Sequence, residues 1–227
     1  MPKYLLLFEK AESVRWLGHL DIHRAFERAV RRAELPIAFS NGFNPHSRLA
    51  FASALSTGIT GKAEPALLEL HESLPPTQLQ ERLNEALPPG IRIRDCQEIS
   101  DADAKEHLHR YDRAVYEVTC ACPEDTTVEQ TQTAVEALLA LPEICVTRVR
   151  EKRTSTADIR PFLFALSLLP ETVGNARLTL QMTVALGEGG VARPGEVVSA
   201  LSETLPGLTL RRAQRIQVFQ SQVIEGR

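Results

Sequence analysis

Residues 76–99 read PTQLQERLNEALPPGIRIRDCQEI, and residues 194–216 read PGEVVSALSETLPGLTLRRAQRI. In each segment, apolar residues recur at the spacing of one helix face, and a proline–glycine turn follows. The segment then ends in a strand in which apolar and polar residues alternate. With a one-residue slip at the turn, the matching positions are Pro76, Leu79, Leu83, Glu85, Leu87, Pro88, Gly90, Ile91, Ile93, Arg94, Gln97 and Ile99, against Pro194, Val197, Leu201, Glu203, Leu205, Pro206, Gly207, Leu208, Leu210, Arg211, Gln214 and Ile216. The period of about 120 residues is that of a whole domain and predicts an internal duplication. The alternative is a chance likeness between two helix-turn-strand units.

The same patterns extend outward from these two segments. In the first half we predict strands at 3–8, 37–40, 49–56, 66–71 and 91–99, and helices at 21–34 and 78–86. In the second half we predict strands at 116–122, 144–150, 162–169, 178–186 and 208–219, and helices at 128–141 and 196–205. The fold class predicted is α+β, with two tandem ferredoxin-like (βαββαβ) domains at 1–100 and 114–227 and a charged linker at 101–113.

Composition limits the function classes. Of the 227 residues, 43% are hydrophobic and 24% charged, as in ordinary globular proteins, and the net charge of −3 confines any nucleic-acid-binding surface to a local patch. No apolar run reaches the roughly 18 residues that span a bilayer. The apolar run at the start of the chain is too short for a signal peptide, because charged residues follow it closely. We therefore expect a cytoplasmic protein with reduced cysteines.

The densest polar constellation lies between residues 15 and 48. Six arginines face three acidic residues there; these are Arg15, Arg24, Arg28, Arg31, Arg32 and Arg48, against Asp21, Glu27 and Glu34. Arg24, Arg28 and Arg31 fall on one helical stripe, and guanidinium groups bind phosphates and carboxylates through paired donors. The alternative is a solvated face with a Glu27–Arg31 pair. Asp21 is the predicted N-cap of the helix.

Two histidines, His19 and His46, are the candidates for proton transfer, because histidine titrates near neutral pH. Either could instead make structural hydrogen bonds. Trp16 could stack on a base or fill the core, and the core is favoured. In the turn predicted at Asn41–Pro45, Asn44 joins the candidate binding residues Arg15, His19, Asp21, Arg24, Arg28, Arg31, His46 and Arg48.

The second half offers another set of cations. Arg148, Arg150 and Lys152 have strand spacing and share one face, and Arg160 follows. They form either a second basic rim or a charged sheet edge that resists aggregation. No iron–sulfur, phosphate-loop, dinucleotide-binding, zinc-protease or serine-hydrolase motif is present, so we predict no metal and no cofactor, and lean against an enzyme.

Several motifs resemble the radical-SAM-linked proteins of unknown function. They are Leu17-Gly18-His19-Leu20-Asp21, Arg24-Ala25-Phe26-Glu27-Arg28-Ala29, Arg31-Arg32-Ala33, Leu35-Pro36, Ser40-Asn41-Gly42-Phe43-Asn44-Pro45-His46, Gly58, Glu64, Asp158-Ile159-Arg160-Pro161 and Ala192-Arg193-Pro194. Glu34 stands where the family usually has Gly. The resemblance implies an accessory protein for a radical-SAM partner with a cobalamin-binding-type domain, acting on RNA or a ribosomal component.

The leading hypothesis is therefore an adaptor that binds RNA or a ribosomal component and presents it to the radical-SAM partner. A second hypothesis is a metal-independent RNA-processing enzyme that uses His19 and His46 as general acid and base. A third is a structural scaffold, in which the motif only stabilises the first domain.

Overall fold

The structure is a computed structural model that describes residues 1–100, 108, 110–150, 153–187 and 189–221. The chain forms two compact units, residues 1–111 with the chain from Arg215 on, and Asp112–Gln214. The repeat alone would have assigned that last segment to the second half. The α+β class is confirmed, with four α-helices and mostly antiparallel strands among the described residues. Most of the predicted linker and Lys152 lie outside the described residues.

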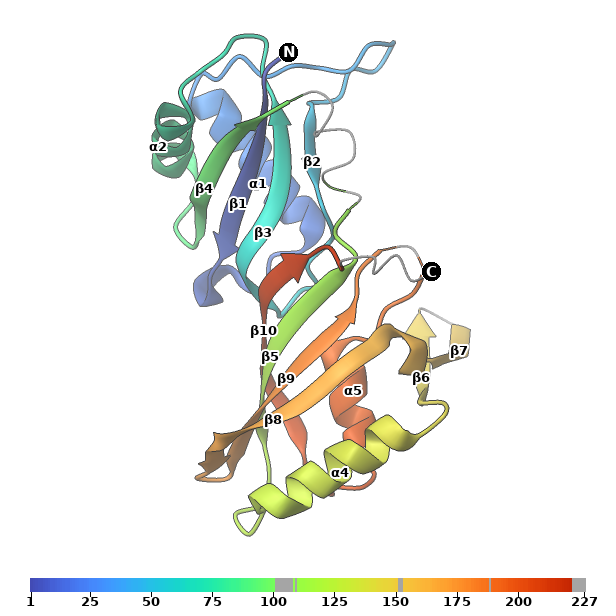
Figure 1. Ribbon diagram of the computed structural model, residues 1–227. Coiled ribbons are helices and arrows are strands. Elements are labelled where there is room, and N and C mark those ends of the chain that lie inside the picture. The colour runs from blue at the N-terminus through green and yellow to red at the C-terminus, as the bar shows by residue number, and fades with distance from the viewer. Residues whose placement is uncertain (101–107, 109, 151–152, 188, 222–227) are drawn as a thin grey trace, which may run out of the picture. The chain divides into compact units, whose positions relative to one another are not determined.

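The first unit has the predicted order of elements (Figure 1). These are β1 (Lys3–Lys10), η1 (Glu12–Val14), α1 (His19–Arg32), β2 (Leu49–Phe51), β3 (Thr60–Glu69), α2 (Pro76–Ala86) and β4 (Ile91–Ile99). The hydrogen-bonded order is β4-β1-β3, β2 also pairs with β3, and these pairs are antiparallel. Both helices pack on one face of this sheet, because their apolar residues share a single core with β1, β3 and β4.

Helix α1 forms because its apolar residues recur at helical spacing. Ile22, Phe26 and Val30 are buried, as are the alanines between them. The Phe26 ring meets Phe8 and Phe51 edge-on, with ring centroids 5.0 and 5.3 Å apart. Burying side chains of this size stabilises the fold by about 1.5–3 kcal/mol each. The opposite face of the helix is left to solvent.

Three local predictions in the first unit are wrong, and β3 begins at Thr60, six residues before the strand predicted at 66–71. Helix α1 begins at His19 with Gly18 as its N-cap, and Asp21, two residues inside, accepts a hydrogen bond from the Gly18 amide at 3.0 Å. The segment 37–40 makes only isolated bridges, because the polar turn that follows cannot extend a ladder. Strand β2 ends at Phe51, well before residue 56.

The chain leaves α1 through a left-handed residue. Glu34 has φ +49°, a conformation that usually favours glycine after a helix. The Arg82 guanidinium donates to the carbonyls of Ala33 and Glu34 there. Glu34 therefore has the backbone conformation of the glycine that is usual here in the family that the sequence resembles. The neighbouring Arg82 supports this conformation through its two hydrogen bonds.

The second unit contains one strand, β7 (Arg153–Asp158), that the sequence did not predict. Its elements are β5 (Arg113–Ala121), α4 (Val128–Ala140), β6 (Cys145–Arg150), β7 (Arg153–Asp158), η2 (Arg160–Phe162), β8 (Leu163–Gly174), β9 (Arg177–Ala185), α5 (Pro194–Leu201) and the first part of β10 (Thr209–Phe219), whose residues from Arg215 on belong to the first unit. The hydrogen-bonded order is β10-β5-β9-β8, while β6 and β7 form a separate hairpin. β7 was missed because it is polar and lacks an apolar alternation.

The repeated segments adopt the same local conformations. Pro76 and Pro194 each open a helix, where proline is favoured. Leu83 and Leu201 are fully buried in the two helices. After each helix the glycine of the turn has a positive φ, +96° at Gly90 and +85° at Gly207.

Candidate functional site

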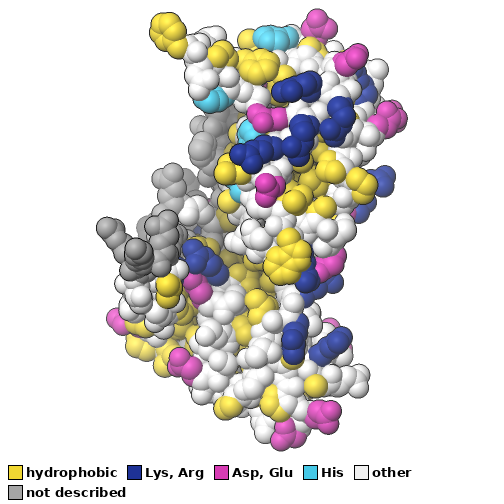
Figure 2. Space-filling view, turned by 180° about the vertical axis from the view of Figure 1, so that it is seen from behind, with side chains coloured by type: hydrophobic (Ala, Val, Ile, Leu, Met, Phe, Trp, Pro, Cys, Tyr) yellow, Lys and Arg dark blue, Asp and Glu magenta, His cyan; other side chains and the backbone are white. Residues whose placement is uncertain are grey.

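The outward face of α1 carries three arginines without partners. Arg24, Arg28 and Arg31 are exposed, as their helical spacing predicted. Among the described residues none of these guanidiniums makes a hydrogen bond or an ion pair. Figure 2 shows Lys and Arg side chains gathered in a row across the first unit. The three residues are called the arginine stripe below.

Glu27, the acidic residue at helical spacing from the stripe, is bound to other side chains. Glu27 accepts a hydrogen bond from the Ser47 hydroxyl at 2.9 Å, and its other oxygen lies 3.6 Å from Nδ1 of His23. The Glu27–Arg31 pair that the spacing would permit is therefore not made. The Ser47 contact also brings the second motif, residues 40–48, against α1.

The other three arginines of the constellation already have partners. They are Arg15 with the Glu12 carboxylate, Arg32 with the Ala86 carbonyl, and Arg48 with Glu69 at 4.0 Å. Of the six arginines counted in the sequence, half hold the fold together and half remain available to a ligand.

The two candidate histidines have different surroundings. The His19 ring packs edge-on against Phe51, with centroids 5.5 Å apart. Burial, and secondarily the nearby His23, lowers the pKa of His19 below its ordinary value and so favours the neutral imidazole. His46 is exposed in the turn, where its amide donates to the Ser40 hydroxyl at 2.9 Å. No contact joins the two histidines among the described residues, so their shared role as acid and base stays a prediction.

Two further residues of the motif are exposed. Asn44 lies in the turn between the isolated bridge partners Phe39 and Ser47. Trp16 precedes α1, and 67% of its surface is accessible to solvent. The prediction that Trp16 fills the core is wrong, because the turn between η1 and α1 directs Val14 and Leu17 toward the core and Trp16 outward.

Beneath this surface the first unit buries three charged side chains. Lys10, Glu64 and Arg215 are 1%, 3% and 1% exposed. The Arg215 guanidinium donates from Nε to Glu64 Oε1 at 2.9 Å and from Nη2 to Glu64 Oε2. Gly61 makes room for the carboxylate, since a Cβ there would lie 2.4 Å from Glu64 Oε1.

Sequence reasoning did not select Lys10 or Arg215, and Glu64 entered only through the family resemblance. A signal for Lys10 was present, because it continues the inward alternation of Tyr4, Leu6 and Phe8 along β1. Its charge argued against a buried position. Arg215 carried no such signal, since its partner lies 151 residues away.

Lys10 connects the buried cluster to the motif above it. Its ammonium donates to the Leu17 carbonyl at 2.8 Å, just before α1 begins. Burial lowers the pKa of Lys10 to about 8, with Glu64 opposing the change and Arg215 adding to it. A small cavity of about 10 Å³ lies beside it, lined by Phe8, Lys10, His19, Ile22, Phe51, Ser53, Leu55 and Glu64. That volume suits about one water molecule.

The arginines predicted as a second rim are engaged in the second unit. Arg148 pairs with both oxygens of Glu196, at 2.7 and 2.9 Å, and donates to the Val191 carbonyl. Arg160 donates to the carbonyls of Leu139 and Leu163. The Arg150 side chain lies outside the described residues. The described part of the rim therefore supports the fold.

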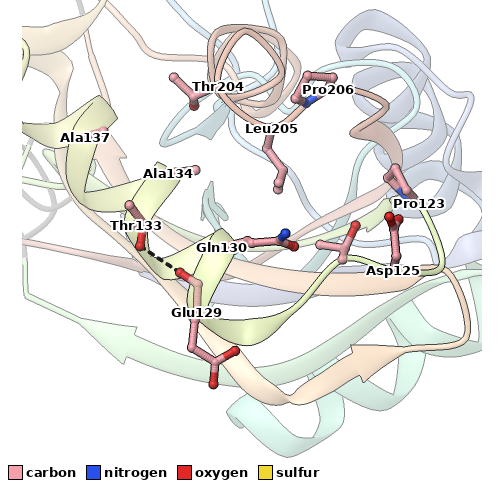
Figure 3. Close-up of a pocket in the computed structure, with 11 residues that line it drawn as sticks. Pro123, Asp125, Glu129, Gln130, Thr133, Ala134, Ala137, Thr204, Leu205 and Pro206 are labelled. Carbon is pink, nitrogen blue, oxygen red and sulfur yellow. Dashed lines mark hydrogen bonds between the residues drawn. The ribbon is translucent and has the colours of Figure 1, made fainter.

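The second unit also has an open hollow of about 630 Å³ (Figure 3). One wall is α4 from Glu129 to Ala137, and the other is the segment Thr204–Pro206. Its acidic side chains, Asp125 and Glu129, do not suit a phosphate. Among the described residues there is no cluster of three His, Cys, Asp or Glu suited to a metal ion. No helix in the described part of the chain is long and apolar enough to cross a membrane.

A protein-family model matches most of the chain. Residues 3–194 fit the family described as "Uncharacterized protein conserved in bacteria (DUF2344)", and the chain belongs to this family. The family fits the expectation of unknown function, and its description contains no link to radical-SAM chemistry. No curated protein matches the chain.

Solved structures share the fold. A chain of a Cbf5-Nop10-Gar1 complex is similar with a TM-score of 0.56 and 10% identity, over 96% of this chain and 50% of that one. A chain of an H/ACA RNP bound to a substrate RNA containing 2′-deoxyuridine gives 0.52 and 9%, over 96% and 49%. The chain thus spans about half the length of these relatives, and the likeness shows the fold alone.

Proposed function

We propose that the chain binds RNA through the arginine stripe of α1. The observation that carries this proposal is that Arg24, Arg28 and Arg31 are exposed and have no protein partner among the described residues. Three exposed guanidiniums that are not paired with a carboxylate repel one another, and a phosphate backbone relieves that repulsion while releasing its counterions. The stripe makes this surface basic although the whole chain is acidic.

The comparison with solved structures adds modest support. One of the proteins with this fold is an H/ACA RNP bound to a substrate RNA. RNA association on the same fold is consistent with the stripe, although at 9% identity no residue role transfers.

The experiment is a titration of a labelled mixed-sequence RNA at several salt concentrations. Each phosphate contact on a single strand contributes roughly −0.7 to the slope of log affinity against log salt. The double variant Arg28→Gln/Arg31→Gln should therefore flatten the slope by about 1.4. Wild-type protein without RNA binding, or a variant with an unchanged slope, contradicts the proposal.

A matched control removes the same charge elsewhere. Arg177 and Arg211 are exposed arginines of the second unit. The variant Arg177→Gln/Arg211→Gln lowers the net charge equally and should leave the slope unchanged. If both double variants act alike, only overall charge matters and the stripe has no specific role.

The finer role that we propose is that of an adaptor, in the cytoplasm, which presents the RNA to a radical-SAM partner. Its support is the motif resemblance around His19, Asn44 and His46. Affinity purification from native lysate tests it, with RNase treatment as the control. Recovery of the chain without a radical-SAM protein that is demonstrably expressed contradicts the adaptor role and leaves RNA binding untouched.

We also propose that the two units are tandem ferredoxin-like domains related by duplication. In the first unit β4-β1-β3-β2 follows the same connectivity as β10-β5-β9-β8 in the second, with β6 and β7 inserted. The positive φ at Gly90 and Gly207 supports the same pairing. Superposition of the units in an experimental structure tests it, and a better fit in a different strand order contradicts it.

A further inference from the structure

Trp16 is the one tryptophan of the chain and is largely exposed, in the turn between η1 and α1. An indole left in water forgoes the stabilisation that its burial would give. The Arg15 guanidinium lies over its ring, with Cζ 4.6 Å from the ring centroid. The indole is a flat group on which nucleic-acid bases stack, and the guanidinium, which is paired with the Glu12 carboxylate, lies against it.

The surrounding backbone holds this tryptophan in place. The Gly58 amide donates to the Arg15 carbonyl at 2.8 Å. Gly58 has φ +85°, and a Cβ there would lie 3.2 Å from Cζ3 of Trp16, so the ring packs closely on that glycine. A ring supported in this way loses little further freedom when a ligand stacks on it.

The segment is also fixed from its buried side. Lys10 donates to the Leu17 carbonyl at 2.8 Å, one residue after Trp16. The Ala11 amide donates to the Gly90 carbonyl at 2.8 Å, and any Cβ at Gly90 would collide with Ser13 and Val14. The buried cluster and this glycine therefore support the turn that displays the indole.

The exposed apolar surface continues onto the helix face that carries the arginines. Leu20 is 66% exposed and stands one turn before Arg24, at the start of the arginine stripe. The order along the chain is thus an indole, an aliphatic side chain and then three cations. Aromatic groups next to a basic track are the arrangement by which proteins bind single-stranded nucleic acids.

We infer that Trp16 is a stacking platform for an unpaired base, so that the RNA on the arginine stripe is single-stranded at this end. This inference rests on the proposed RNA binding. The charge of the stripe selects a polyanion, and the indole selects one with flat bases. A duplex keeps its bases stacked inside and could offer only its phosphates.

The single tryptophan makes the test direct. Single-stranded RNA should quench the fluorescence of Trp16 in the wild-type protein. A fully paired RNA duplex without unpaired bases should bind by charge without this quenching, and so should inorganic polyphosphate. Trp16→Ala should bind labelled single-stranded RNA about tenfold more weakly with the same salt slope, and should bind polyphosphate normally. Trp16→Phe should recover most of the affinity.

A matched control exists in the second unit. Phe164 is an exposed aromatic with the Arg113 guanidinium 3.7 Å from its ring centroid. Phe164→Ala removes the same kind of aromatic–guanidinium pair and should leave RNA affinity unchanged. The melting temperature of each variant shows whether it is folded.

The outcomes separate this inference from the proposed function. RNA binding could depend on Arg28 and Arg31 while RNA leaves the Trp16 fluorescence unquenched and Trp16→Ala keeps the wild-type RNA affinity. In that case the stacking platform is refuted and the proposed function stands. If polyglutamate quenches Trp16 as strongly as RNA, the surface is suited to an acidic protein and the inference is overturned. If the wild-type protein binds no RNA, both fail.

Discussion

Arginines in two regions of the chain have opposite roles. On α1, Arg24, Arg28 and Arg31 have no partner among the described residues, whereas Arg148 and Arg160 in the second unit are bound to the protein itself. Both groups look alike in the sequence, as cations at regular spacing. The comparison teaches that a basic pattern indicates where cations lie but not whether they are available to a ligand.

The difference has a physical origin in what lies opposite each side chain. Helix α1 buries one face, so the stripe on its other face meets only solvent. Arg160 reaches the Leu139 carbonyl near the end of α4, where the last carbonyls of a helix lack internal partners. Arg148 meets the first turn of α5 through Glu196. These arginines satisfy groups that the fold would otherwise leave unpaired.

The largest effect is expected at the extreme of this comparison, the fully buried Arg215. Glu64→Gln removes the carboxylate charge that pairs with that buried guanidinium and should lower the free energy of unfolding by about 3–5 kcal/mol. Urea denaturation measures the loss. The control is Glu69→Gln on the same strand, whose carboxylate lies 4.0 Å from Lys3 and Arg48 and should cost about 1 kcal/mol or less. Equal losses for the two variants would show that burial does not distinguish these arginines.

A middle-sized effect compares the two regions directly. Arg148→Gln breaks a partly buried, two-pronged pair with Glu196 and should cost roughly 1.5–3 kcal/mol, the range for hydrogen bonds to charged groups. Arg28→Gln removes the same group from the exposed stripe and should change stability by no more than about 0.5 kcal/mol. Thermal and urea unfolding of the two variants, Arg148→Gln and Arg28→Gln, measure this difference. A destabilised Arg28→Gln would mean that the stripe is structural.

The smallest effect concerns pH and the Lys10 ammonium. Its pKa falls from 10.5 in the unfolded chain to about 8 in the fold, so between these values the unfolded state holds the extra proton. The free energy of unfolding should therefore rise with pH in that window, on the order of 1 kcal/mol from about pH 7.5 to about pH 9. Lys10→Met should lack this rise. The wild-type curve minus the Lys10→Met curve isolates the effect from other groups, and a flat difference would contradict it.

The sequence predicted the elements well where local patterns act alone. The alternation at Ile91, Ile93 and the turn at Gly90 located β4 with the observed bounds. The sequence was less successful for β7 and for residues 37–40, because hairpin and bridge partners depend on chain far from the segment. Trp16 was misplaced because an aromatic side chain is usually buried and only the turn geometry directs it outward.

The sequence by itself therefore determined the α+β class and the amphipathic helix that turns Arg24, Arg28 and Arg31 outward. These depend on spacings within one element, which a linear pattern records. Only the tertiary structure decided that Lys10, Glu64 and Arg215 share a buried cluster, and that Arg148 and Arg160 are occupied. Such pairings join strands and helices that are distant in the chain. They form because a buried charge without a partner would cost too much free energy.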